Sequence, residues 1–232
     1  ANVSGEQVVK ISSNNMDTKT LLKLAKRVNE LLADPKVDAV VITHGTDTLE
    51  ETAYFLNLVT KSDKPVILVG AMRPATAISA DGPMNLLEAV RVASTPEAKG
   101  KGVMIVMNDE INGARDVTKT NTTNPATFKS PELGAMGYVS GNKVRFYKQS
   151  TKSHTTNSEF DVSKLETLPR VDIIYSHVDD DRIMADAAVA AGAKGIIHAG
   201  TGNGSIANPT MEGLKDAVAK GVVVVRSARV PN

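Results

Sequence analysis

The sequence lacks cysteine and tryptophan, and only 3% of its residues are aromatic. Without cysteine the chain forms no disulfide and offers no thiolate to a metal ion. Its 27 lysines and arginines balance 26 aspartates and glutamates without a basic tract, so we expect no nucleic-acid partner. No apolar run approaches the ~20 residues of a membrane span, so we expect no membrane partner.

The composition is otherwise that of an ordinary globular protein. The chain has 232 residues, 41% of them hydrophobic and 23% charged, which suffices for one large or two modest domains. Residues 1–4 contain neither an initiator methionine nor a signal segment, so we expect this end to be cut or processed.

Apolar runs alternate with helix-length segments in the first part of the chain. Residues 37–43, 65–71 and 103–107 are predicted to be buried strands, and this alternation indicates a parallel sheet. A helix precedes the first strand, because its apolar residues recur at helical spacing. These are Leu21, Leu24, Ala25, Val28, Leu31 and Leu32. A hairpin is predicted at residues 137–147, around a Ser-Gly-Asn-Lys turn.

The strand and helix pattern resumes after a polar stretch. Strands are expected at residues 171–175, 195–198 and 222–225, with helices near 181–191 and 210–220. We therefore predict a doubly wound α/β domain over residues 1–147, a linker over 148–169 and a smaller α/β domain over 170–232.

The segment VITHGTDT at residues 41–48 joins a strand-like run to a polar turn. Its β-branched residues end at Gly45, and Thr46, Asp47 and Thr48 follow at once. Ligands of open parallel sheets bind at the carboxyl ends of strands, beside the free N–H groups of the next helix. These side chains therefore suit a small polar zwitterion. Because threonine and aspartate are also common N-cap residues, a purely structural role stays open.

Lys119 is a candidate base for such a site. Amide hydrolysis needs a nucleophile, a group that takes its proton and donors for the oxyanion. A lysine accepts the proton of a threonine only where burial or nearby charge lowers its pKa. Lys119 lies between Thr118 and Thr120 rather than among charges. The alternative for this residue taken alone is a solvated surface lysine.

Three other patterns favour structural roles. The glycines in residues 200–204 are too closely spaced for a dinucleotide loop, and the acidic run 179–181 lacks the further oxygen ligands of a calcium site. The four histidines show no metal-ligand spacing and are interpreted as hydrogen-bonding or exposed residues: His44, His154, His177 and His198. We therefore expect no metal, nucleotide or other cofactor.

Five ordered blocks of this sequence resemble the bacterial type II L-asparaginases and glutaminase-asparaginases. The blocks are residues 41–56, 70–74, 79–85, 116–123 and 198–205. The resemblance covers nearly the whole chain. It implies an asparaginase-like fold and conversion of L-asparagine to L-aspartate and ammonia through a threonine acyl-enzyme, with L-glutamine as a second substrate. It also implies a homotetramer with sites shared between subunits, in the periplasm or secreted.

The resemblance also assigns roles to individual residues. Thr46, Asp47 and Lys119 match the catalytic threonine, aspartate and lysine of the family, and Asp47 also binds the substrate α-ammonium. Ser13 matches the serine that holds the α-carboxylate. The remaining positions given by resemblance are Asn14, which stands where many members have glutamine, and Ser205, which is reached from a neighbouring subunit. Ala71 is a further substrate-binding candidate on other grounds, because it lies at the end of a predicted buried strand that could place its backbone carbonyl at the site.

Family members also carry segments that these residues do not match. These are an initial strand ending in a Gly-Gly-Thr turn with the primary nucleophile, a mobile lid, and a carboxyl-terminal acidic residue. We therefore expect the 232 residues to be a portion of a longer polypeptide and to fold poorly alone. The rival from another class is a catalytically silent fragment or binding module that retains amino-acid recognition. A weaker rival is a flavodoxin-like nucleotide binder.

Overall fold

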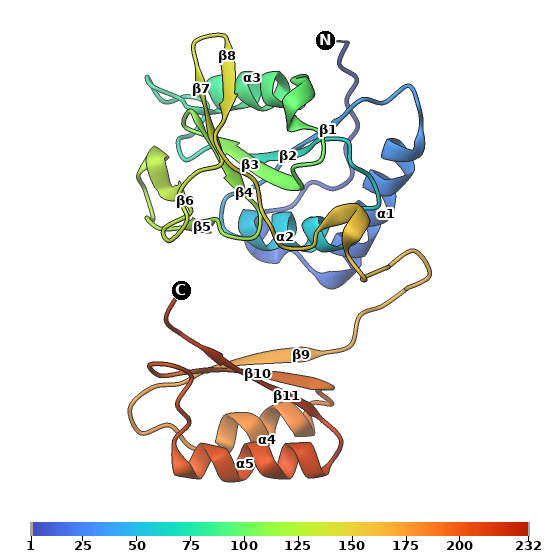
Figure 1. The fold of residues 1–232 in the computed structure, drawn as a ribbon. Coiled ribbons are helices and arrows are strands. Elements are labelled where there is room, and N and C mark those ends of the chain that lie inside the picture. The colour runs from blue at the N-terminus through green and yellow to red at the C-terminus, as the bar shows by residue number, and fades with distance from the viewer. Residues whose placement is uncertain (1, 232) are drawn as a thin grey trace. The chain divides into compact units, whose positions relative to one another are not determined.

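The structure, a computed structural model that describes residues 2–231, divides into two units, Ala1–Glu166 and Thr167–Asn232 (Figure 1). The first unit contains a six-stranded sheet of order β1-β2-β3-β4-β7-β8. Its strands are β1 (Val40–Thr43), β2 (Val66–Val69), β3 (Val103–Met107), β4 (Glu110–Gly113), β7 (Gly137–Ser140) and β8 (Lys143–Phe146). The first three are parallel, and the other pairs are antiparallel. The predicted α/β fold is confirmed, and the predicted hairpin forms β7 and β8.

Helices cover both faces of this sheet. They are α1 (Thr18–Ala33), α2 (Leu49–Val59) and α3 (Gly82–Ala93). In Figure 1, α1 and α2 lie on one side of the parallel strands and α3 on the other, which is the doubly wound arrangement. Helix α1 begins where the Asp17 side chain accepts a hydrogen bond from the Thr20 N–H at 2.7 Å, an N-cap. It buries Leu24, Ala25, Val28 and Leu32 of the predicted apolar stripe and Leu22 in addition, whereas Leu21 and Leu31 of that stripe are half-buried.

Strand β1 differs from its predicted burial. The residues of β2 and β3 are all buried, whereas those of β1 are half-buried or exposed. The reason is position, because within residues 2–231 β1 pairs with β2 alone and forms an edge of the sheet. The apolar sequence therefore predicted the strand correctly, but its prediction that the strand is buried was wrong.

Short elements complete the first unit. A two-stranded antiparallel sheet joins β5 (Thr118–Lys119) to β6 (Phe128–Lys129). Short 3-10 helices are at Ser13–Asn15, Pro96–Ala98, Pro125–Thr127 and Thr155–Asn157. The stretch 148–166 also belongs to this unit. There Val162 is buried and Ser158 accepts a hydrogen bond from Lys61 Nζ at 2.8 Å. The predicted linker bounds, 148–169, stay a prediction.

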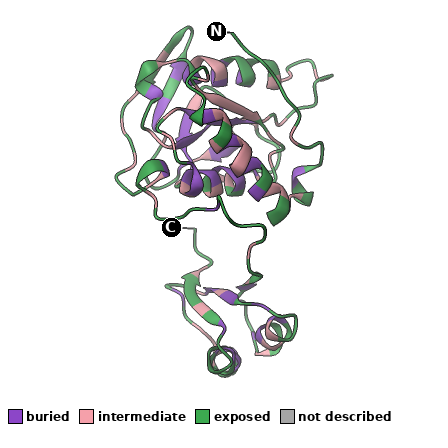
Figure 2. Cartoon of the chain, turned by 90° about the vertical axis from the view of Figure 1, so that its right-hand side faces the viewer, coloured by how far each residue is buried: buried purple, intermediate pink, exposed green. Residues whose placement is uncertain are grey.

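The second unit is a three-stranded parallel sheet of order β11-β10-β9. Its elements are β9 (Val171–Tyr175), α4 (Ile183–Ala190), β10 (Gly195–Gly200), α5 (Asn208–Ala219) and β11 (Val223–Ala228), as the strand and helix pattern predicted. Both helices cover one face of this sheet (Figure 2). The core of the unit includes Ile174, Ile196 and Leu214. Ile173 and Tyr175, which alternate with Ile174 along β9, are 72% and 63% exposed.

His198 contradicts its interpretation as a hydrogen-bonding or exposed residue. It is completely buried in β10, and neither ring nitrogen has a hydrogen-bond partner among the described residues. Its Nε2 lies 3.7 Å from Asp180 Oδ2, which is too long for a hydrogen bond. The sequence did not show this, because the burial of β10 depends on both helices that pack over it.

Glu88, on the inner side of α3, makes the stability of the first unit depend on pH. The residue is 3% exposed and its Oε2 accepts a hydrogen bond from the Asp109 N–H at 3.2 Å. Burial, and after it the neighbouring Asp109, raises the pKa of Glu88 from 4.5 to about 7. Between these values the unfolded chain loses a proton that the folded chain keeps, so stability falls as pH rises from 4.5 to 7.

Glu88→Gln should therefore stabilise the protein at pH 8, because glutamine imitates the protonated acid. We expect the free energy of unfolding in urea, followed by circular dichroism, to rise by about 1–3 kcal/mol relative to wild type. The gain should shrink as pH falls and vanish below pH 4.5. Glu97→Gln, at an exposed position, is the control without such a gain. A gain independent of pH would contradict the account.

Candidate active site

The polar residues after β1 lie in a turn that leads directly into α2. Thr48 is the N-cap residue of α2, yet its side chain makes no capping hydrogen bond. Its Oγ1 instead donates to the Ser13 carbonyl at 2.8 Å. This hydrogen bond attaches the turn to the Ser13–Asn15 segment. A helix N-cap with a purely local role does not need such a contact.

Ser13 supports the same turn through its side chain. It is 5% exposed, and its Oγ accepts a hydrogen bond from the Asp47 N–H at 3.1 Å. A Cβ on Gly45 would lie 2.6 Å from this oxygen, so the close approach requires glycine. The Ser13 hydroxyl hydrogen stays available for an acceptor such as a carboxylate.

The structure brings Lys119 to Thr46 and Asp47 across more than seventy residues of sequence. Its Nζ donates to Thr46 Oγ1 at 3.0 Å and to Asp47 Oδ1 at 3.1 Å. The Lys119 side chain is 19% exposed and that of Asp47 58% exposed. An amine in contact with a hydroxyl can take or return its proton, and the exposed carboxylate can receive a cation.

Glu50 connects β5 to the first turn of α2. Its Oε1 accepts from Thr118 Oγ1 at 2.9 Å, and its Oε2 accepts from the Lys119 N–H at 2.6 Å. Sequence reasoning missed this residue. Glu50 and Glu51 both suit the positive end of a helix, and only the tertiary contact distinguishes them.

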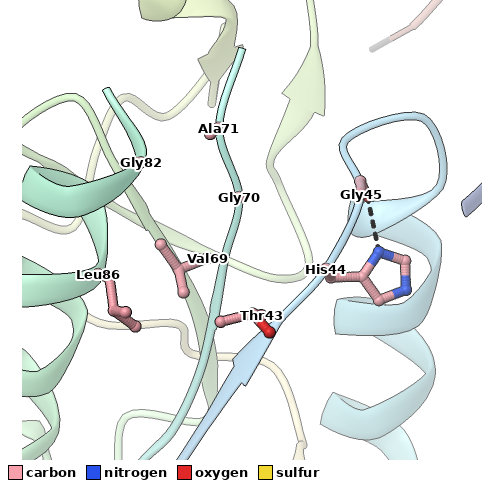
Figure 3. Close-up of a pocket in the computed structure, with 8 residues that line it drawn as sticks. All are labelled: Thr43, His44, Gly45, Val69, Gly70, Ala71, Gly82 and Leu86. Carbon is pink, nitrogen blue, oxygen red and sulfur yellow. Dashed lines mark hydrogen bonds between the residues drawn. The ribbon is translucent and has the colours of Figure 1, made fainter. Parts of the chain in front are cut away.

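A pocket of about 350 Å³ lies between the carboxyl ends of β1 and β2 and helix α3 (Figure 3). Its lining residues are Thr43, His44, Gly45, Val69, Gly70, Ala71, Gly82 and Leu86. The structure thus places Ala71 at the strand ends that also carry the Thr46 turn. The ring of His44 points away from the pocket toward α2 in Figure 3, and its Nε2 lies 2.9 Å from Thr52 Oγ1.

Asp81 holds the backbone that follows Ala71. Its carboxylate accepts from the N–H groups of Met72 and Arg73, both at 2.9 Å, and from Asn85 Nδ2 at 3.1 Å. Burial by itself would raise the pKa of Asp81, but these hydrogen bonds outweigh it and lower the pKa. The ionised carboxylate therefore holds the backbone at Met72 and Arg73, next to the pocket residue Ala71.

Ala71 lines the pocket, whose lining does not include Ser13, Thr46, Asp47 or Lys119. Two further predicted residues lie outside both the pocket and the contacts of these four residues. Asn14 is exposed, and its side chain contacts those of Ser12 and Asn15. Ser205 lies in the second unit, exposed, in a short bridge with Thr201. Within residues 2–231 no cluster of three or more histidine, aspartate or glutamate side chains could hold a metal ion. No helix in that range is long and apolar enough to cross a membrane.

The sequence matches two family models. Residues 1–152 match "Asparaginase, N-terminal", and residues 170–232 match "Glutaminase/Asparaginase C-terminal domain". The chain belongs to the asparaginase family.

Relatives of this asparaginase-family chain align along 99–100% of its length. It is 60% identical to "L-asparaginase 2" of Bacillus subtilis (strain 168), a match that spans 100% of this chain and 62% of the relative. It is 50% identical to "L-asparaginase 2" of Escherichia coli (strain K12), over 100% of this chain and 66% of that protein. It is 50% identical to a "Glutaminase-asparaginase" of Pseudomonas fluorescens biotype A, over 99% and 63%. The chain thus spans 62–66% of the length of these curated relatives.

A solved structure confirms the fold of the asparaginase-family chain. The crystal structure of a probable cytoplasmic L-asparaginase from Campylobacter jejuni is 53% identical, with a TM-score of 0.96. The match covers 99% of this chain and 73% of that structure.

Gly70→Ala tests how closely the end of β2 must approach the Thr46 turn. A Cβ at Gly70 would lie 2.8 Å from the His44 carbonyl oxygen and 3.1 Å from Thr46 Cγ2, so the turn must shift. We expect a loss of about 1–3 kcal/mol in the free energy of unfolding. Gly5→Ala is the control, because a Cβ there meets no atom within 4 Å. Equal free energies of unfolding for the two variants would show that the Thr46 turn can shift without loss of stability, and would contradict the need for glycine at position 70.

Proposed function

We propose that the protein to which this chain belongs hydrolyses the side-chain amide of L-asparagine, giving L-aspartate and ammonia, and that it also accepts L-glutamine. The observation that carries the proposal is the contact of Lys119 Nζ with both Thr46 Oγ1 and Asp47 Oδ1. The names of the relatives support the reaction, since they include L-asparaginases and glutaminase-asparaginases.

Asp47 and Ser13 recognise the amino-acid end of the substrate in this proposal. The Asp47 side chain is 58% exposed and uses Oδ1 for Lys119, so Oδ2 can accept the α-ammonium. The Ser13 hydroxyl accepts from the Asp47 N–H and can donate its own hydrogen to the α-carboxylate. The α-ammonium of the substrate thus meets the Asp47 carboxylate, and its α-carboxylate meets the neighbouring Ser13 hydroxyl. By family resemblance, Asn14 and a partner subunit's Ser205 complete the binding site, and Ala71, which lines the neighbouring pocket, is proposed to contribute its backbone carbonyl.

Thr46 and Lys119 carry the proton transfers. A hydroxyl attacks the amide carbonyl carbon, the C–N bond breaks, and ammonia leaves after it gains a proton. Water then hydrolyses the ester and restores the hydroxyl. The hydrogen bond between Lys119 Nζ and Thr46 Oγ1 provides the path for these protons. Following the family resemblance, the attacking threonine belongs to a segment outside these residues.

The assembly and location are proposed on the same basis. We propose a homotetramer whose sites are shared between subunits, to be tested by light scattering after size-exclusion chromatography. A periplasmic or secreted location is supported by a 50% identical relative from Haemophilus influenzae (strain ATCC 51907 / DSM 11121 / KW20 / Rd) named "Probable L-asparaginase periplasmic". The Campylobacter protein is described as probable cytoplasmic, so cell fractionation must decide.

Ammonia release from L-asparagine tests the proposed reaction, on a sample of known intact mass with L-glutamine in parallel. Turnover by the full-length protein is expected. Turnover by a 24.5 kDa species would instead contradict the placement of the attacking threonine outside these residues. A folded full-length protein that binds L-aspartate without turnover would favour the silent binding module.

Lys119→Met should reduce kcat at least ~10²-fold, because it removes the acid–base group. It should leave L-aspartate binding, measured by calorimetry, largely intact. Asp47→Ala should lose both turnover and binding. Lys129→Met is the matched control, because Lys129 lies on the paired strand β6 and bonds to Glu110 at 2.5 Å instead. Retained turnover in Lys119→Met would contradict the assignment.

A further inference from the structure

Glu50 makes two hydrogen bonds that join separate halves of the proposed site. It lies in the first turn of α2, four residues after Thr46 and three after Asp47. Its two carboxylate oxygens accept from the Thr118 hydroxyl at 2.9 Å and from the Lys119 N–H at 2.6 Å. Hydrogen bonds to an ionised acceptor are about twice as strong as neutral ones.

On the side away from Glu50, the segment that carries Lys119 is attached to Thr127. The Thr127 carbonyl accepts from the Thr120 N–H at 2.8 Å, and the Thr127 hydroxyl accepts from the Asn121 N–H at 2.8 Å. Strand β5 contains two residues, and its ladder partner β6 also contains two. The Lys119 N–H bonds to Glu50 rather than to β6. Glu50 therefore ties Thr118 and the Lys119 backbone to α2, the helix that immediately follows the Thr46 turn.

We propose that Glu50 is a positioning residue, whose carboxylate fixes Lys119 at the distance from Thr46 and Asp47 that proton transfer requires. This inference rests on the proposed function and adds a residue to it. Without Glu50, the Lys119 backbone can move away from α2, and the Nζ contacts at 3.0 and 3.1 Å lengthen. Misplacement by ~1 Å can lower a rate ~10²-fold.

The alternative role for Glu50 is to stabilise the start of α2, where a negative side chain interacts favourably with the helix dipole. Glu51 offers a matched comparison, because it lies in the same turn with the same charge. Its side chain is exposed and makes no hydrogen bond or ion pair among the described residues. If the helix dipole is responsible, replacing either glutamate by alanine should lower kcat. If positioning of Lys119 is responsible, only the replacement of Glu50 should lower kcat.

Steady-state kinetics of the full-length protein with L-asparagine separate these roles. Glu50→Ala should lower kcat ~10–100-fold and leave KM within ~3-fold, because Ser13 and Asp47 still hold the substrate. Glu50→Gln should stay within ~3-fold of wild type, since its amide can accept from the Lys119 N–H and donate to the Thr118 hydroxyl. Glu51→Ala should match wild type. Should Glu50→Ala fail to fold, Thr118→Val, which removes one of the two bonds, should lower kcat ~3–10-fold.

A second measurement does not depend on turnover. Reductive methylation followed by mass spectrometry reports how readily Lys119 Nζ reacts in the absence of substrate. Its methylation should be faster in Glu50→Ala or Thr118→Val than in wild type, and unchanged in Glu51→Ala. Unchanged kcat and unchanged methylation in the Glu50→Ala and Thr118→Val variants would overturn the proposal. If the wild type releases no ammonia, the proposed function fails, and the methylation rates alone decide whether Glu50 positions Lys119.

Discussion

The contact of the Lys119 side-chain nitrogen with the Thr46 hydroxyl and the Asp47 carboxylate is the constraint on which the proposed site depends. The three groups come from two segments, the turn after β1 and the short strand β5. An ion pair with a side chain as exposed as Asp47, at 58%, contributes about 0–1 kcal/mol. That is too little to hold two loops together, so the surrounding backbone contacts must do so.

Three sets of contacts hold the turn after β1 and strand β5 in place. Ser13 holds the Asp47 backbone from one side, and Gly45 allows its close approach. Gly70 lets the end of β2 pack against the turn from another side. Glu50, in the first turn of α2, accepts hydrogen bonds from both residues of β5 and so holds this strand beside the helix. The reactive side chains are therefore placed by hydrogen bonds and tight packing that involve little of their own charge, as preorganised sites require.

The sequence predicted the elements better than their surroundings. Periodicity identified α1, the parallel strands and the whole second unit, because these patterns are local. It assigned burial to β1, which lies at an edge, and hydrogen bonding or exposure to His198, which is buried without a partner. Burial depends on neighbours far along the chain, and a local pattern does not contain them.

The candidate site shows the same division. Thr46 and Asp47 were visible in one segment, as polar residues after a strand. Lys119 was a candidate base by its residue type and received its role by resemblance. Its place beside Thr46 and Asp47 depends on a two-residue strand that no periodicity reveals. Glu50 was hidden because Glu51 beside it has the same charge and the same helical position. The roles assigned to Ser13, Asn14, Ala71 and Ser205 stay predictions.

The central claim is that Thr46 and Lys119 act as one unit in amide hydrolysis, and a double-mutant cycle tests it most directly. The measurement is kcat/KM for L-asparagine in Thr46→Val, Lys119→Met and the double variant of the full-length protein. If the groups act together, the double variant should be no more than ~3-fold slower than the slower single variant, because either change already breaks the unit. Losses that multiply would show that the two groups act independently, and would contradict the account.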